Sequence, residues 1–380
     1  MTRKLFSTQI EVPAGMINFG VGQPGASVLP MEIMRQAAQH RFSQDDSLLL
    51  NYGPEQGDGP FLQALATFLS DAYDLPVDPL SLMTTGGASQ ALNMICTFFT
   101  QPGDTIFVEE PTYFIAPCIF RDHGLNLVTV PTDENGMIIE VLETLLVDHQ
   151  PSFVYTIPAY QNPPGVTLSS ERRQRLVELS LAHDFLIVAD EVYHLLNFAD
   201  EPPPPLAAMI ESGTVLSVGS FSKILAPGLR LGWIQAGPEL IDRLVDIQFV
   251  FSGGALNQFT SHLVRSALEL GLQQQHLENL RNIYAKRSKI LCAAIREHLG
   301  DIVQLRDPDG GFFVWVELPS EMDANALMPL AAKHDVSFQP GVNFSSHYHL
   351  HNFMRFCFAH YEHEDLAEGV RRLAKVLTKG

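Results

Sequence analysis

Short apolar runs alternate with longer segments of helical spacing between about residues 80 and 235 of the chain. The runs are almost continuous in apolar and β-branched residues, as in strands that are buried on both faces. They predict strands over residues 105–108, 153–156, 185–189 and 215–218. Between two of them, Ser169 can cap a helix whose inner face carries Leu176 and Leu179. This alternation indicates an α/β fold with a mostly parallel sheet that is covered by helices.

The pattern changes after about residue 270. Apolar residues recur at helical spacing from residue 276 to 299, which predicts one long helix. Strand patterns over 311–316 and 353–358 then precede a closing helix over 364–377. Because domains average about 150 residues, a chain of this length has room for two, and we expect a second one beyond the long helix.

Composition narrows the class of protein. Of the 380 residues, 46% are hydrophobic and 18% are charged, which is typical of a globular protein. The formal net charge of -19 argues against nucleic acid and anionic membranes as partners. No apolar run reaches the length of a membrane span, and the opening residues lack the apolar region of a signal peptide, so we expect a cytoplasmic protein.

The cysteines predict neither a metal site nor a disulfide framework. Cys96, Cys118, Cys292 and Cys357 are far apart and form no C-x-x-C pair. We interpret them as reduced cysteines in apolar surroundings.

Two segments at predicted strand ends carry candidate chemistry. In the segment 217–233, Lys223 follows a buried strand between two serines and is itself followed by Arg230, an arrangement that can hold an imine and an anion together. In the segment 188–193, Asp190 lies at the carboxyl end of a strand, where ligands of open α/β sheets bind. Taken alone, Asp190 is better explained as a helix N-cap.

Two further segments complete the pattern. Residues 157–165 follow another buried strand and contain Asn162, and a plain proline-rich turn is the alternative interpretation. Residues 84–91 form a glycine-rich turn that opens a helix, whose free N–H groups can bind a phosphate. A lone glycine turn is more often a simple connection. The four segments gain weight because they all occur at strand ends of one predicted sheet.

In this order, the four segments resemble the class I/II pyridoxal-phosphate-dependent aminotransferases of fold type I, the aspartate aminotransferase superfamily. The resemblance runs from Ile17 through Arg355 and is strongest in S-x-S-K-x-x-x-P-G-x-R, D-E-x-Y and N-P-x-G, nearest to 2-aminoadipate and aromatic aminotransferase-like members. It implies a large domain (46–285) with a mostly parallel seven-stranded sheet between helices. It also implies a smaller α+β domain built from residues 1–45 and 286–380.

The resemblance also implies roles around the cofactor pyridoxal 5'-phosphate. Lys223 would form the imine with the cofactor, which suits an amine whose pKa falls on burial. Asp190 would bind the pyridinium nitrogen, and Asn162 and Tyr193 would bind the phenolic oxygen of the ring. The residues implied for the phosphate are Ala88, Ser89, Ser220, Ser222 and Arg230.

Four more residues take roles from the same resemblance. Tyr113 would stack on the cofactor ring, although a core tyrosine is the alternative. Tyr52 would reach the phosphate in the neighbouring subunit, which implies a homodimer with a shared active site. Arg355 would clamp the substrate carboxylate, and Gly22 would let the backbone approach that carboxylate closely. Asn162 is expected to bind substrate as well as cofactor.

Some features depart from the family pattern or lie outside it. Pro164 replaces the threonine that is more usual in the asparagine turn, and we expect no change of chemistry. Only 16 residues precede Ile17, so the N-terminal helix that recognises acidic substrates in some relatives has no clear counterpart. His347, His349 and His351 alternate as metal ligands sometimes do, but a loop near the mouth of the site explains them better, and we expect no metal.

The sequence therefore predicts a homodimeric aminotransferase that moves an amino group from an L-amino acid to a 2-oxo acid by a ping-pong route. Neutral, aliphatic or aromatic, substrates are weakly favoured. A carbon–sulfur β-lyase on the same fold is the alternative, because the motifs do not separate the two reactions. A transcription factor with an aminotransferase-like domain is disfavoured, since such proteins need a DNA-binding segment and a less acidic surface.

Overall fold

The computed structural model describes residues 8–199, 201–246, 248–254 and 256–377. The first seven residues, part of the predicted small domain, lie outside the described residues. A large sheet carries the strand order β2-β9-β8-β7-β6-β3-β4-β5. Its strands are β2 (Leu82–Thr85), β3 (Thr105–Glu110), β4 (Asn126–Asp133), β5 (Gly136–Met137), β6 (Phe153–Thr156), β7 (Leu186–Asp190), β8 (Val215–Ser220) and β9 (Gly232–Ala236).

The sheet is parallel in its centre and antiparallel at its edges. Strands β4, β3, β6, β7 and β8 run in the same direction, whereas β9 pairs antiparallel with both β8 and β2. Seven strands match the expected sheet, and the two-residue β5 adds an eighth at the edge. A strand of two residues is too short to show a periodic pattern, so it could not be predicted from the sequence.

Both faces of this sheet are buried, as its continuous apolar strands require. Phe107, Val154 and Ile187 belong to a cluster that α5 and α6 cover. Val108, Tyr155 and other alternate residues belong to the larger core on the opposite face. Asp190 lies two residues after Val188 on β7 and therefore points to the same face of the sheet as Val188 and Tyr155.

The helices around the large sheet have the bounds α1 (Met31–Phe42), α2 (Gly59–Tyr73), α3 (Ala88–Phe99), α4 (Ile115–Asp122), α5 (Ile139–Asp148), α6 (Ser170–His183), α7 (Phe221–Ile224), α8 (Pro238–Val245), α9 (Gln248–Phe251) and α10 (Gln258–Glu269). The predicted cap is confirmed, because the Ser169 hydroxyl accepts a hydrogen bond from the Arg172 backbone N–H at the start of α6. Short 3-10 helices occur as η1 (Ala26–Val28), η2 (Ser47–Leu50), η3 (Pro79–Ser81), η4 (Leu206–Ser212), η5 (Pro227–Leu229) and η6 (Gly341–Phe344).

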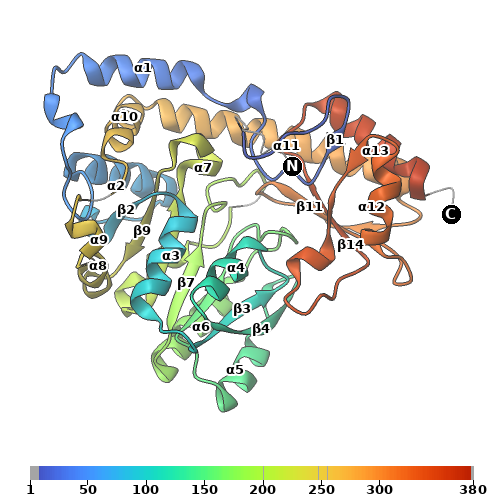
Figure 1. The fold of residues 1–380 in the computed structure, drawn as a ribbon, viewed down its shortest axis with the longest axis horizontal. Helices are drawn as coiled ribbons and strands as arrows, with labels where there is room; N and C mark the ends of the chain where they lie inside the picture. Colours follow the sequence, from blue (N-terminus) through green and yellow to red (C-terminus); the bar gives the residue numbers. More distant parts are fainter. Residues whose placement is uncertain (1–7, 200, 247, 255, 378–380) are drawn as a thin grey trace, which may run out of the picture.

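The predicted long helix is α11 (Leu272–Leu299), and Figure 1 shows it running from the large sheet's side of the molecule toward the C-terminal elements. There a four-stranded antiparallel sheet has the order β10-β11-β14-β13. Its elements and neighbours are β10 (Gln304–Leu305), β11 (Phe313–Glu317), α12 (Ala324–Ala332), β12 (Val336–Ser337), β13 (Gln339–Pro340), β14 (Phe353–Cys357) and α13 (His363–Leu377).

The N-terminal segment joins this second part of the molecule. Strand β1 (Ile17–Asn18) pairs in parallel with β12, so residues from both ends of the chain meet there. The exact domain limits stay a prediction. The limit at residue 285 falls inside the unbroken α11, and α1 packs against α10 of the large part.

Candidate active site

The carboxyl ends of β6, β7 and β8 bring three of the predicted segments to one edge of the sheet. Parallel strands that end together place their following loops side by side, which is where α/β proteins bind ligands. The turn after β6 carries Asn162, β7 ends at Asp190, and β8 leads directly into α7 with Lys223. No helix starts at Asp190, so the N-cap explanation of this residue is wrong.

Lys223 occupies the centre of the cluster. Ser220 caps the four-residue α7 by accepting a hydrogen bond from the Ser222 backbone N–H at 3.1 Å. The Lys223 Nζ donates to the backbone oxygen of Gly22 at 3.1 Å and lies 5.7 Å from the centre of the Tyr193 ring. Burial lowers the pKa of Lys223 to about 8, which increases the fraction of neutral amine near physiological pH.

Asp190 is a buried acid with one free oxygen. Its Oδ2 accepts a hydrogen bond from the Tyr155 hydroxyl at 2.9 Å, whereas Oδ1 is buried and has no hydrogen-bond partner among the described residues. Burial raises the pKa of Asp190 to about 6, and the contact with Tyr155 works against that rise. A buried unpartnered oxygen is costly, which indicates that a ligand's donor belongs there.

Arg355 lies on β14 and reaches back to the large sheet's edge. Its Nη1 donates to Asn162 Oδ1 at 2.9 Å and its Nη2 donates to the Gly20 oxygen at 2.9 Å. Burial lowers the pKa of Arg355 to about 10. A Cβ on Gly22 would meet Arg355 Nη2 at 3.3 Å, so the glycine keeps the space beside the guanidinium open.

The glycine turn and Arg230 form a separate polar cradle. Helix α3 begins at Ala88 after Gly87, whose φ of +90° favours glycine and whose cap position offers no side-chain acceptor. The Arg230 Nη2 donates to the Gly86 oxygen at 3.1 Å, which places a guanidinium beside the free N–H groups of Ala88 and Ser89. A cation next to a helix N-terminus is suited to bind a phosphate dianion.

The two remaining tyrosines differ in their surroundings. Tyr113 is partly buried, and burial together with nearby Asp190 raises its pKa to about 12, so it lies close to the site. Tyr52 is 84% exposed, and no hydrogen bond or ring contact among the described residues joins it to Lys223.

Sequence reasoning missed several residues of the site. Tyr155 contacts Asp190, and the rings of Phe312 and Phe313 contact Tyr193 with centroid distances of 5.5 and 5.8 Å. The Lys223 Nζ lies 5.3 Å from the centre of the Phe312 ring. Tyr155 in the buried strand 153–156 is a usable signal, because a buried tyrosine usually needs a hydrogen-bond partner.

The histidine segment touches the large sheet. The His347 Nε2 lies 3.1 Å from Thr129 Oγ1, and the ring centroids of His347 and His349 are 6.1 Å apart. Within the described ranges, no group of three or more histidine, cysteine, aspartate or glutamate side chains is placed to hold a metal ion.

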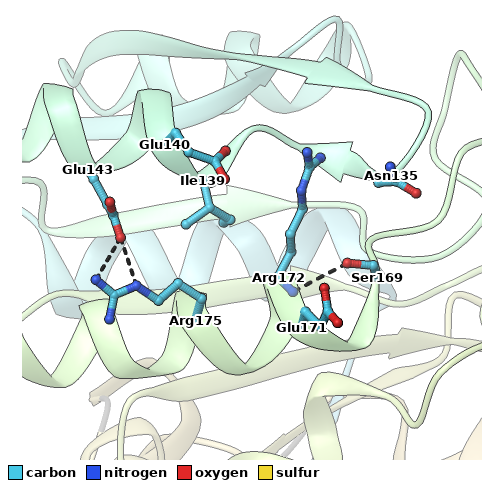
Figure 2. A pocket seen from close by; sticks show the side chains of 8 residues that line it. All are labelled: Asn135, Ile139, Glu140, Glu143, Ser169, Glu171, Arg172 and Arg175. Carbon is cyan, nitrogen blue, oxygen red and sulfur yellow. Dashed lines mark hydrogen bonds and ion pairs between the residues drawn. The ribbon is translucent and has the colours of Figure 1, made fainter.

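A hollow of about 460 Å³ lies elsewhere, between α5 and α6. Figure 2 shows that charged side chains line it, among them Arg175, which pairs with Glu143 with Nη2 and Oε1 2.7 Å apart. None of the residues drawn there belongs to the cluster around Lys223.

The fold and the cluster define a class of enzyme in which a buried lysine, an aspartate and an arginine meet at the strand ends of an α/β fold type I transferase. A family model described as aminotransferase class I and II matches residues 14–373. The chain belongs to this family and is an aminotransferase, which confirms the predicted family and fold class.

Individual relatives agree with this membership. Aromatic-amino-acid aminotransferase 1 of Thermococcus litoralis is 35% identical over 95% of this chain and 88% of the relative. The structure of a multiple substrate aminotransferase from Thermococcus profundus has a TM-score of 0.90 and 34% identity, over 96% of this chain and 92% of that one. LysN, the alpha-aminoadipate aminotransferase of Thermus thermophilus complexed with N-(5'-phosphopyridoxyl)-L-leucine, has a TM-score of 0.87 and 30% identity, with 96% and 93% covered.

One further finding concerns membranes. Over the part of the chain that the structure describes, no helix is both long and apolar enough to span a bilayer.

Proposed function

We propose that the protein uses pyridoxal 5'-phosphate to transfer an amino group between an L-amino acid and a 2-oxo acid by a ping-pong route. The observation that carries the proposal is the Lys223 amine, with its lowered pKa, in one buried cluster with Asp190 and Arg355. The cytoplasmic location stays a prediction of the sequence.

The described residues fit this cofactor. The free Oδ1 of Asp190 suits a protonated ring nitrogen, because a buried carboxylate favours a cationic donor. The cradle of Ala88, Ser89 and Arg230 suits the phosphate, and the hydroxyls of Ser220 and Ser222 lie on the neighbouring turn. Further residues that would hold the cofactor are Asn162, Tyr193 and Tyr113 around the ring, and Tyr52 from a neighbouring subunit.

When bound, pyridoxal phosphate supplies a carbonyl for imine formation and a conjugated ring that takes up electron density from the substrate's α-carbon. Lys223 supplies the amine, and burial keeps enough of it neutral to act as a nucleophile. With the cofactor bound, the Lys223 Nζ would also be the base that moves the proton of the substrate's α-carbon. Asp190 would stabilise a positive charge on the ring nitrogen through its free Oδ1.

The carboxylate of the substrate is assigned to Arg355. Its guanidinium lies 4.1 Å from the centre of the Phe313 ring and 4.9 Å from that of Phe344, which fixes its plane. Asn162 holds the same guanidinium from the large sheet's side. The aromatic surroundings favour amino acids with neutral side chains, aliphatic or aromatic.

A homodimer with a shared active site is part of the proposal. Large apolar side chains lie exposed on α1, η2, α9 and α10 and in the loop after η2. Helix α10 packs against both α1 and η2, and Figure 1 shows α1, α9 and α10 at the same end of the molecule. We call them the apolar patch, and its residues are Phe42, Leu48, Leu50, Tyr52, Phe249, Phe251 and Phe259. An exposed apolar patch of this kind is typical of a protein–protein interface. Tyr52 within it is free to reach a second copy's site.

The test is a visible spectrum of the purified protein, to which amino acids are added one at a time without any 2-oxo acid. We expect the yellow colour of the cofactor–lysine imine to bleach with neutral amino acids and to return when a 2-oxo acid is added. Persistent yellow colour with release of pyruvate from an S-substituted cysteine would instead show β-lyase activity. A clear preference for glutamate, aspartate or 2-aminoadipate would contradict the proposed substrate class.

A further inference from the structure

Tyr155 has no place in the chemistry described so far, yet its hydroxyl contacts the acid of the site. It lies on β6 and is fully buried, and its hydroxyl donates to Asp190 Oδ2 at 2.9 Å. Phe120 of α4 and Phe153 of β6 lie beside it, and the Phe120 ring meets the Tyr155 ring edge-on with a centroid distance of 5.2 Å. The hydroxyl is therefore held in one place by packing, since a buried aromatic ring has few alternative rotamers.

The contact with Tyr155 makes the two oxygens of the Asp190 carboxylate different. Oδ2 is occupied by Tyr155, and Oδ1 is left without a partner among the described residues. A hydrogen bond to a carboxylate favours its ionised form, and burial disfavours that form. The titratable and charged groups around Asp190 are Glu109 at the end of β3, Tyr113, Tyr155, the adjacent Glu191, Tyr193 and Lys223 on α7.

Most of these neighbours do not favour ionisation. Glu191 raises the pKa of Asp190, whereas Lys223 and the nearby Val192 backbone N–H lower it. Once Lys223 is engaged with the cofactor, its charge no longer supports the carboxylate as a free ammonium would. The Val192 backbone N–H and the Tyr155 hydroxyl remain, and Tyr155 is the side chain among them, because it belongs to the core of the large sheet and not to the reacting groups.

We propose that Tyr155 is a positioning residue whose hydroxyl keeps Asp190 ionised and keeps Oδ1 directed at the ring nitrogen of the cofactor. The inference rests on the proposed function, because it needs pyridoxal phosphate in the site. Without the hydroxyl, Asp190 holds its proton more often, and the ring nitrogen loses its anionic partner. An imine conjugated to a less positive ring is more basic, so its protonation shifts to higher pH.

The test compares Tyr155→Phe with wild type in two measurements. The first is the dissociation constant of pyridoxal phosphate from the protein stripped of cofactor, which we expect to rise about tenfold, as for loss of a hydrogen bond to a charged group. The second is the visible absorbance of the loaded protein against pH, whose midpoint we expect to move upward. Equal values for Tyr155→Phe and wild type in both measurements would overturn the inference.

Tyr284→Phe is the matched control. Tyr284 is also fully buried, and its hydroxyl has no hydrogen-bond partner among the described residues. The same chemical change there leaves the absorbance midpoint at the wild-type value. An equal shift in both variants would assign the effect to general loosening of the core and would also contradict the role of Tyr155.

Two further variants separate this role from folding. In an Asp190→Asn background, Tyr155→Phe has little additional effect on cofactor binding if the hydroxyl acts through the carboxylate, and a full additional loss would contradict that route. If Tyr155→Phe fails to fold, Phe120→Leu keeps the hydroxyl but loosens the ring, and a smaller shift in the same direction is expected. An unshifted midpoint in Phe120→Leu would then count against the inference. Failure of the wild type itself to bind pyridoxal phosphate would reject the proposed function instead.

Discussion

Burial shifts the pKa values of three ionisable side chains of the site, in each case in the direction that favours the neutral form. They are Lys223, at about 8, Asp190, at about 6, and Arg355, at about 10. The charged form of each group would be more stable in water, and the fold buries these groups without giving each a full set of hydrogen-bond and charge partners. Such an arrangement is typical of sites that bind a charged ligand, because the ligand supplies the missing partners.

The first prediction at this scale concerns the reactivity of Lys223 in the protein stripped of cofactor. Only the neutral amine attacks a carbonyl, so the rate of imine formation with added pyridoxal phosphate should rise with pH. We expect its midpoint near pH 8, as the lowered pKa requires, and not near the ordinary value of 10.5. The measurement is the initial rate of the visible absorbance change, with Lys223→Ala as the blank. A midpoint near pH 10 would contradict the burial argument.

The second prediction is that Asp190→Asn stabilises the cofactor-free protein. The pKa of Asp190 rises from 3.8 to about 6 on folding, so the folded chain binds the proton more tightly than the unfolded chain does. The buried charge therefore costs stability above pH 6, by up to about 3 kcal/mol, and costs almost nothing below pH 4. Urea unfolding of both proteins at pH 4 and pH 8 checks this, with the exposed Asp242→Asn on α8 as control. A variant that is less stable than wild type at pH 8 would refute it.

At the scale of elements, helix α6 ties together two loops that carry the site. Arg173 on this helix is fully buried and donates to the backbone oxygens of Leu168, Pro158 and Pro204. Its Nη1 also lies 3.7 Å from Oε1 of Glu191, the neighbour of Asp190. One guanidinium thus joins the start of the Asn162 turn to the loop that follows β7.

Two adjacent arginines of α6 give the third prediction. Arg173→Met leaves Glu191 buried with its hydrogen bonds but without its cationic partner, and should cost about 3–5 kcal/mol of unfolding free energy. Arg172→Met removes a partly exposed ion pair in which Arg172 Nη1 lies 2.6 Å from Asp133 Oδ1. Its loss should cost about 1 kcal/mol or less of unfolding free energy. Chemical denaturation of the cofactor-free proteins measures both. Equal losses would show that burial does not distinguish the two pairs.

Some elements could be predicted from the sequence and others could not, for physical reasons. The strand over 153–156 and the helix capped by Ser169 follow from local pattern, because both are encoded within a few residues. The contact of Lys223 with Gly22 joins residues 201 positions apart, so no local pattern reveals it. The family motifs predicted the central cluster, but the Tyr155 contact depends on how β6 and β7 lie beside each other in the sheet.

At the scale of the whole molecule, the apolar patch, which includes the exposed Tyr52, contributes no residue to the cluster around Lys223 in the same chain. Several of the site's residues come instead from the large sheet and from β14, which belong to the same copy. A second copy that covers the patch would remove its apolar side chains from water. The proposed homodimer therefore accounts both for the exposed apolar patch and for the position of Tyr52 away from the Lys223 cluster of its own chain.

The fourth prediction tests that shared site by complementation. Lys223→Ala and Tyr52→Ala each disable the proposed site, and a mixed dimer contains one site in which both residues are intact. We expect activity to reappear when the two variants are unfolded and refolded together, and to stay low when each is refolded alone. Activity that does not exceed the sum of the separate variants would contradict a site shared between subunits. Size-exclusion chromatography confirms that dimers have formed.

The pairing of β1 with β12 has a consequence for how the chain is made. Ile17 leaves the ribosome more than three hundred residues before its partner Val336. At the usual pace of synthesis, this amounts to a wait of roughly 15 to 60 s, during which the large sheet can already form. The backbone of Gly20 and Gly22, just after β1, meets Arg355 only after that wait. Nascent chains are thus expected to complete the strands around Lys223 and Asp190 first and to acquire Arg355, the proposed carboxylate clamp, last.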